Sequence, residues 1–62
     1  MILYHIQYHM GRSCFDAYFT DKVEAENLYK SLIRSRDIVG GAVFWKLDVV
    51  EHDRQFVKEF GE

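Results

Sequence analysis

Residues 2–20 read ILYHIQYHMGRSCFDAYFT, and this stretch decides the fold. From Ile2 to Met10, every even position holds a large apolar side chain, whereas the odd positions hold Leu, His, Gln and His. From residue 13 onward, Phe15, Ala17 and Phe19 again place apolar side chains at every second position. A period of two is typical of half-buried strands. The stretch therefore predicts two strands, over residues 2–10 and 13–20.

A tight hairpin is expected to join these two strands. Gly11 stands first in a two-residue loop, the position that a type II′ turn gives to glycine. Such a turn pairs Tyr8 with Phe15 and Ile6 with Ala17, so the apolar residues share one face. The opposite face then pairs His9 with Cys14, Gln7 with Asp16, and His5 with Tyr18. Turn chemistry and apolar pattern agree, and this agreement supports the hairpin.

The next segment predicts an amphipathic helix over residues 21–36. Asp21 followed by Glu24 resembles a capping box, which marks a helix start. Apolar residues then recur at helical spacing on one face: Ala25, Leu28, Tyr29, Leu32 and Ile33. We expect a turn at Gly40-Gly41 after the helix.

A third strand is predicted over residues 42–50. Its odd positions, Val43, Trp45, Leu47 and Val49, are all apolar and are expected to face the helix. Phe44 and Lys46 would then point to the other side of the sheet. Residues 53–60 contain Phe56, Val57 and Phe60, a spacing that fits a short terminal helix capped by Asp53, or a frayed tail.

These elements predict one small α+β domain over residues 1–62, of two layers with the order ββαβ(α). One amphipathic helix would cover a three-stranded, mainly antiparallel sheet. We favour the strand order 2-1-3, with the first strand in the middle. The alternative places the third strand parallel beside the second. A chain of 62 residues has room for one marginal core and no deep multi-residue active site.

Composition narrows the function classes. Cys14 is the single cysteine, so no internal disulfide forms and a cytoplasmic location is expected. Metal-ligand spacings are missing, and we expect no cofactor. No segment approaches the ~20 apolar residues of a membrane span. With 8 basic and 10 acidic residues the net charge is −2, which disfavours a nucleic-acid partner.

Catalysis has little support in the sequence. His9 opposite Cys14 would be the pair that a thiol nucleophile and its base form. A cross-strand pair of this kind also arises by chance, and no oxyanion donors accompany it. The sequence therefore predicts a protein that is not an enzyme.

Protein binding is the favoured function. We predict a non-enzymatic interaction protein that binds a host protein or a second copy through its open sheet face and an edge strand. The candidate partner-binding residues are His5, Gln7, Asp16, Tyr18, Phe44 and Lys46. Two alternatives remain: residues 53–60 fold back over this face as ordinary core, or the sheet aromatics stack the bases of single-stranded nucleic acid.

The overall pattern resembles small bacteriophage and mobile-element ββαβ proteins of the host-takeover or anti-defence type. A YxIxY strand (Tyr4, Ile6, Tyr8) precedes a D-x-x-E-A-E-x-L-Y helix. The helix residues that carry the pattern are Asp21, Glu24, Ala25, Glu26, Leu28 and Tyr29. This resemblance spans the whole chain, identifies no specific family and implies a host protein as the partner.

Overall fold

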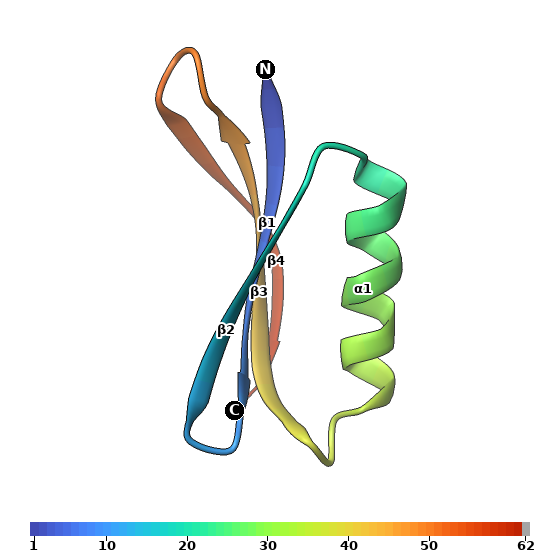
Figure 1. The fold of residues 1–62 in the computed structure, drawn as a ribbon. Helices are drawn as coiled ribbons and strands as arrows, with labels where there is room; N and C mark the ends of the chain where they lie inside the picture. The colour runs from blue at the N-terminus through green and yellow to red at the C-terminus, as the bar shows by residue number, and fades with distance from the viewer. Residues whose placement is uncertain (62) are drawn as a thin grey trace.

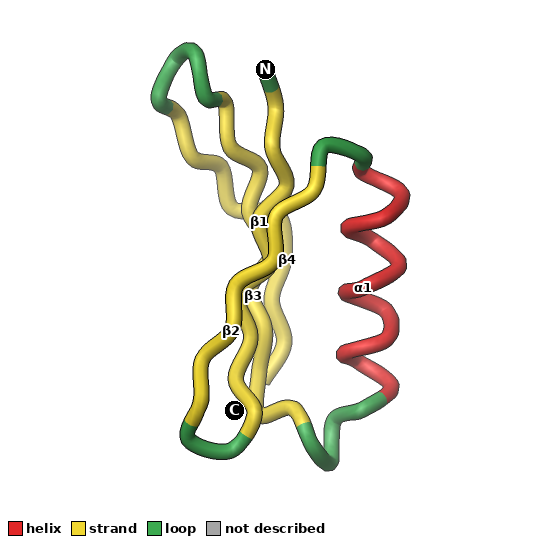
Figure 2. The backbone as a smooth tube through the Cα atoms, viewed as in Figure 1, coloured by secondary structure: helices red, strands yellow, loops and turns green. Residues whose placement is uncertain are grey.

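The computed structural model describes residues 1–61 as four strands and one helix, shown in Figures 1 and 2. The elements are β1 (Ile2–Met10), β2 (Ser13–Phe19), α1 (Lys22–Arg34), β3 (Val39–Asp48) and β4 (Asp53–Gly61). The sheet is antiparallel throughout, with the order β2-β1-β3-β4. The α+β class and the order 2-1-3 are confirmed, and a fourth strand extends the sheet at the β3 edge.

The β1–β2 hairpin forms as the sequence predicts. Tyr8 pairs with Phe15 and Ile6 with Ala17. Gly11 has a φ of +60°, the left-handed angle that the turn requires of its first residue. A Cβ at Gly11 would meet nothing within 4 Å, so the backbone angle and not the available space accounts for glycine here.

Helix α1 begins immediately after its N-cap residue, Asp21. The Asp21 carboxylate accepts a hydrogen bond from the Val23 backbone N–H at 2.9 Å. The helix ends at Arg34, two residues before the predicted end. Its inward face buries Ala25, Tyr29 and Leu32 against β1 and β3.

The core lies between α1 and one face of the sheet. Its buried residues are Ile6, Ala25, Tyr29, Leu32, Val39, Ala42 and Phe44. The Phe44 side chain is fully buried, and its ring meets Tyr4 and Tyr29 edge to face at 6.1 and 5.8 Å between centroids. Aromatic pairs of this geometry add to the free energy gained from area burial alone.

The prediction that Phe44 lies on the open face is therefore wrong. The odd positions Val43, Trp45 and Leu47 are all apolar, whereas the even positions include Lys46 and Asp48, so the period alone favours the wrong orientation of the strand. Pairing with β1 decides the orientation, because Ile6 stands opposite Phe44 and both face the helix. Trp45 consequently turns to the other side.

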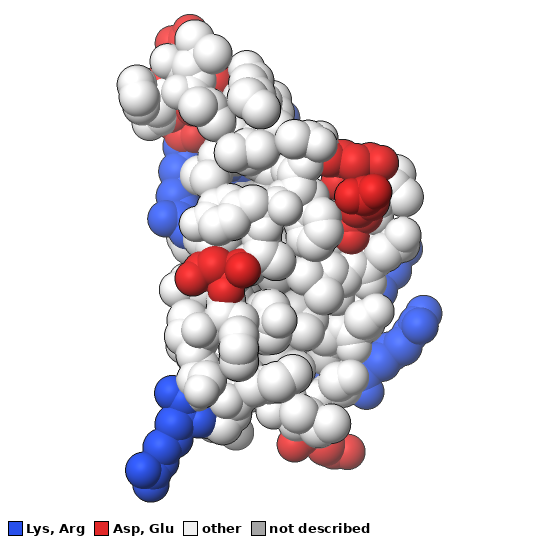
Figure 3. Space-filling model, viewed as in Figure 1, with Lys and Arg blue, Asp and Glu red and all other residues white. Residues whose placement is uncertain are grey.

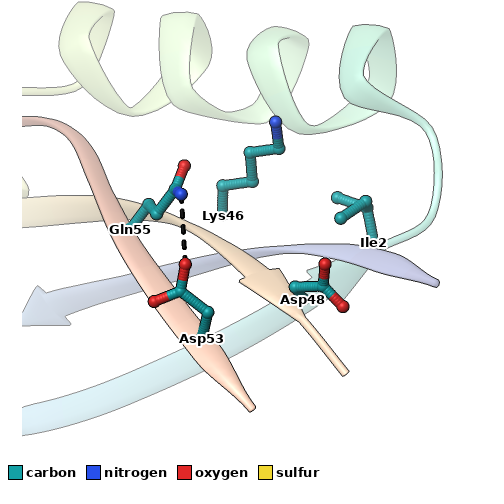
Figure 4. Close-up of a pocket in the computed structure, with 5 residues that line it drawn as sticks. All are labelled: Ile2, Lys46, Asp48, Asp53 and Gln55. Atoms are coloured by element: carbon teal, nitrogen blue, oxygen red, sulfur yellow. Dashed lines mark hydrogen bonds between the residues drawn. The ribbon is translucent and has the colours of Figure 1, made fainter. Parts of the chain in front are cut away.

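Lys46 also lies on the helix side, contrary to the prediction. It stands opposite Tyr4 in the sheet, and Figure 4 shows its side chain directed toward the helix. Strand β3 begins at Val39, three residues early, so Gly40 and Gly41 are strand residues and not the predicted turn. A Cβ on Gly41 would lie 3.1 Å from the Phe60 carbonyl oxygen, which explains why glycine permits this close pairing.

The expected terminal helix over residues 53–60 is wrong: the segment is strand β4. A turn precedes it, in which the Asp48 carboxylate accepts hydrogen bonds from the N–H groups of Val50 and Glu51, both at 3.1 Å. The free edge of β3 offers backbone groups that pairing with β4 satisfies.

Strand β4 also rules out the fold-back alternative, because it lies beside the sheet and not over it (Figure 1). Phe60 packs against Tyr29 on the helix side, with 5.6 Å between ring centroids. Phe56 stands opposite Trp45 on the other side. The segment thus contributes to both faces and covers neither.

We predict that Phe44→Ala destabilises the domain by about 3–5 kcal/mol, because it removes a fully buried ring from a well-packed core. Urea unfolding measures the change. Tyr18→Ala, at a residue 58% exposed, is the control and should cost only about 0.5–1.5 kcal/mol, the contribution of its stacking on another ring. Equal losses in both variants would contradict the assignment of faces.

Burial, and secondly the negative charge of Glu59, raise the pKa of Tyr29 above its ordinary value of 10.0. At a pH between the ordinary and the raised pKa, Tyr29 keeps its proton in the folded state but has lost it in the unfolded state. The free energy of unfolding therefore falls as pH rises above about 10. Tyr29→Phe should flatten this part of the pH dependence while leaving the neutral-pH stability nearly unchanged. An alkaline unfolding profile that Tyr29→Phe leaves unaltered would refute the prediction.

Candidate functional site

The sheet face turned away from α1, hereafter the open face, has no element of residues 1–61 lying over it (Figure 1). Strand register assigns these residues to it: Leu3, His5, Gln7, Asp16, Tyr18, Val43, Trp45, Leu47, Arg54, Phe56 and Glu59. Tyr18 is 58% exposed and Phe56 is 55% exposed. The open face therefore presents large aromatic surface to solvent.

At its centre lies the His5 cluster, formed by His5, Asp16, Tyr18, Trp45 and Arg54. The His5 side chain is only 7% exposed. Its Nε2 lies 2.7 Å from Asp16 Oδ1, and its Nδ1 lies 3.2 Å from Arg54 Nη2. The Tyr18 ring stacks on it at 4.4 Å between centroids, with 6° between the planes. One histidine on β1 thus connects β2 to β4.

These contacts fix the protonation state of His5. A guanidinium can only donate hydrogen bonds, so Nδ1 must be the acceptor from Arg54. The ring proton then sits on Nε2 and is donated to the Asp16 carboxylate. A second proton, on Nδ1, would point at an Arg54 N–H and break that bond. These hydrogen-bonding roles correspond to the Nε2–H tautomer of His5.

Arg54 is held by uncharged partners. Its Cζ lies 4.0 Å from the centroid of the Trp45 ring, a cation–π contact, and its hydrogen bond goes to neutral His5. The close contacts between acidic and basic side chains among the described residues, His5 with Asp16 and Lys58 with Glu26, do not include it. Arg54 is therefore oriented and uncompensated, the condition in which a guanidinium can bind a carboxylate from another molecule.

Trp45 completes the cluster at some cost to the fold. Its ring meets Phe56 edge to face at 5.8 Å. Its indole N–H is buried with no acceptor among residues 1–61. An unpaired buried donor costs about 1–3 kcal/mol of folding stability. Because this donor lies on the open face, buried polar groups are less completely paired there than on the helix side.

Four of the six predicted partner-binding residues lie together on the open face. His5, Asp16 and Tyr18 form the His5 cluster, and the Gln7 side chain donates to Cys14 Sγ at 3.4 Å. Phe44 and Lys46 belong to the helix side and are not part of this surface. Whether the four bind a partner stays a prediction.

The sequence does not predict six residues of the open face: Val43, Trp45, Leu47, Arg54, Phe56 and Glu59. Trp45 was assigned to the helix side together with the other odd residues of its strand. Arg54 and Phe56 were placed in a terminal helix, which hid their register opposite Leu47 and Trp45. The spacing of residues 53–60 carried no signal that could separate a helix from a bulged strand.

The predicted His9–Cys14 pair is adjacent in the sheet but is not joined by a hydrogen bond among the described residues. His9 stands opposite Cys14 in the register, but the hydrogen bond to the Cys14 sulfur comes from Gln7. Residues 1–61 contain no group of three or more His, Cys, Asp and Glu side chains close enough to share a metal ion.

A shallow hollow on the helix side is lined by carboxylates that make hydrogen bonds within the chain itself (Figure 4). It is lined by Ile2, Lys46, Asp48, Asp53 and Gln55. The Asp48 carboxylate already caps the β3–β4 turn, and Asp53 accepts from the Gln55 amide at 3.1 Å. Both carboxylates therefore serve the chain's own donors.

The edge of β2 is the second exposed feature. Figure 3 views the molecule from this edge, and the surface along β2 is largely uncharged. Strand Ser13–Phe19 carries one charged residue, Asp16, and neither Lys nor Pro. Edge strands usually carry such residues to discourage pairing with other chains. The β2 edge is thus open to another strand.

Comparison of the chain with protein-family models, with curated proteins and with solved structures found no match. Among the described residues, no helix has the length and apolarity needed to cross a membrane.

Arg54→Ala should raise the acrylamide quenching of Trp45 fluorescence, because it uncovers one face of the indole ring. Trp45 is the chain's single tryptophan, so the signal comes from this site alone. Arg34→Ala, at the end of α1, is the matched control and should leave quenching unchanged. Equal quenching in the wild type and Arg54→Ala would show that the guanidinium does not cover the ring.

Proposed function

We propose that this chain is a non-enzymatic protein-binding module that recognises its partner through the open face and the adjoining β2 edge. The observation that carries the proposal is a complete sheet face left without a second layer, on which exposed Tyr18 and Phe56 flank an oriented Arg54. Exposed apolar patches on small domains commonly mark interaction sites.

The residue types match those that dominate binding energies. Aromatic residues and arginine are enriched among interface hot spots. Here their conformations are already restricted, since Tyr18 stacks on His5 and Arg54 stacks on Trp45. A surface that is ordered before binding loses less side-chain entropy when it forms a complex.

The β2 edge supports the same proposal. A partner strand could pair with its free backbone groups, while the side chains of that strand reach the open face beside Tyr18. Strand addition supplies backbone hydrogen bonds, and the neighbouring aromatic side chains supply selectivity.

A single-stranded nucleic-acid ligand would use the same rings but meets an unfavourable charge balance. Across the open face, Arg54 is accompanied by the carboxylates of Asp16 and Glu59. Phosphate neutralisation by basic residues dominates such binding. Protein is therefore the better-supported partner.

The double variant Tyr18→Ala/Phe56→Ala should lose its partner without unfolding, because both rings are more than half exposed. Tagged wild type and variant would be compared by capture from a lysate of the source organism, with mass spectrometry and a circular-dichroism melt. Val23→Ala, at a helix residue 64% exposed, is the control and should retain the partner.

Nuclease treatment and salt separate the partner classes. A protein partner should survive nuclease and respond weakly to salt, whereas a nucleic acid should be lost in both cases. Full retention of the partner by the double variant would contradict binding through the open face.

A further inference from the structure

The charge pattern of β4 is symmetric about an apolar centre. Residues 54–59 read RQFVKE, so Arg54 and Glu59 stand equally far from the Phe56-Val57 pair. Arg54 pairs with Leu47, Phe56 with Trp45, and Glu59 with Val43. The register shift at Val57 keeps all three on the open face, although Arg54 and Glu59 are an odd number of residues apart.

The other charged groups nearby are already engaged. Lys58 lies on the helix side, where its Nζ pairs with Glu26 at 3.2 Å. Asp16 accepts from His5 at 2.7 Å. Neither Arg54 nor Glu59 takes part in an ion pair among the described residues. Arg54 and Glu59, one cation and one anion, thus have no ion-pair partner among the described residues and lie on opposite sides of the same aromatic centre.

Such a pattern is complementary to itself. A two-fold axis that lies in the interface and crosses β4 at right angles near Phe56 brings Arg54 of each copy to Glu59 of the other. We propose that a second copy of this chain packs on the open face, with Arg54 facing the partner's Glu59 and the aromatic side chains between the two ion pairs. This inference rests on the proposed function and names its partner.

The open face has the dimensions that such an interface needs. The domain measures 36 × 21 × 16 Å along its principal axes. Four strands of 7 to 10 residues, at ~3.3 Å per residue and ~4.8 Å between strands, make a face of roughly 30 by 19 Å. Two such faces would bury roughly 1,100 Å² in total, above the ~1,000 Å² that a specific interface needs. The packing would also bury Phe56 and Val57, which are 55% and 40% exposed.

Self-association would benefit this chain in particular. A domain of 62 residues buries a small fraction of its surface on folding, so its stability is marginal. Covering the open face gives the two sheets the arrangement of a sandwich, in which aligned sheets pack face to face. Each Arg54 already has its position fixed by His5 and Trp45, so pairing requires little further ordering.

Charge exchange tests the proposal. In Arg54→Glu, both contacts of the dimer become Glu against Glu; in Glu59→Arg, both become Arg against Arg. Each variant alone should raise the dimer dissociation constant by at least about tenfold, equivalent to about 1.4 kcal/mol. An equimolar mixture should restore the dimer, because every contact of the mixed pair joins opposite charges. Sedimentation equilibrium and light scattering report the mass.

Controls separate this interface from other causes. Arg34→Glu, on α1, makes the same charge change away from the open face and should remain dimeric. Circular-dichroism melts establish that both interface variants fold. Since Arg54→Glu also disturbs the His5 cluster, Glu59→Arg provides the variant that leaves the cluster intact.

The opposing outcomes are distinct. A wild-type chain that stays monomeric up to roughly 1 mM, where association would be weaker than about −4 kcal/mol, overturns the dimer. A dimer that survives either single variant, or two variants that fail to associate when mixed, also overturns it. If the wild type is monomeric but its partner capture depends on Tyr18 and Phe56, the dimer fails and the proposed function stands.

Discussion

The packing of Phe44 against Ile6 beneath α1 is the contact on which the rest of the structure depends. It decides which side of β3 faces the helix, and both side chains are completely removed from solvent. Because strand residues alternate, burying Phe44 turns Trp45 outward. One helix, Lys22–Arg34, has enough apolar surface to cover one side of a four-stranded sheet. The opposite side therefore has no layer of its own, and its aromatic side chains are accessible to solvent.

Polar and stacking contacts between side chains order the open face, just as packing against α1 orders the core. The imidazole of His5 connects Asp16 on β2 to Arg54 on β4, across the two inner strands. Tyr18 stacks on the His5 ring, and Trp45 stacks on the Arg54 guanidinium. The result is a surface that is exposed and yet ordered. This combination favours recognition, since binding then requires little loss of conformational entropy.

The sequence predicts best where independent signals agree. Residues 2–20 and the helix were predictable because turn glycine, capping Asp21 and apolar spacing each point to the same structure. The orientation of β3 was not, because Phe44 and Trp45 are both large and apolar and the choice depends on tertiary pairing. Strand β4 was hidden by its register shift, since the spacing of its aromatic residues also fits a helix. His5, Gln7, Asp16 and Tyr18 were placed correctly, while Trp45, Arg54 and Phe56 required the fold.

The central claim is that the two sides of one sheet have different roles, with a closed core on one side and an accessible surface on the other. Hydroxyl-radical footprinting of the chain, dilute enough to be monomeric, tests this most directly by mass spectrometry. The account predicts rapid oxidation of Tyr18 and Phe56 and strong protection of Phe44 and Tyr29 in the same molecules. Protection of Tyr18 and Phe56 equal to that of Phe44 would contradict it.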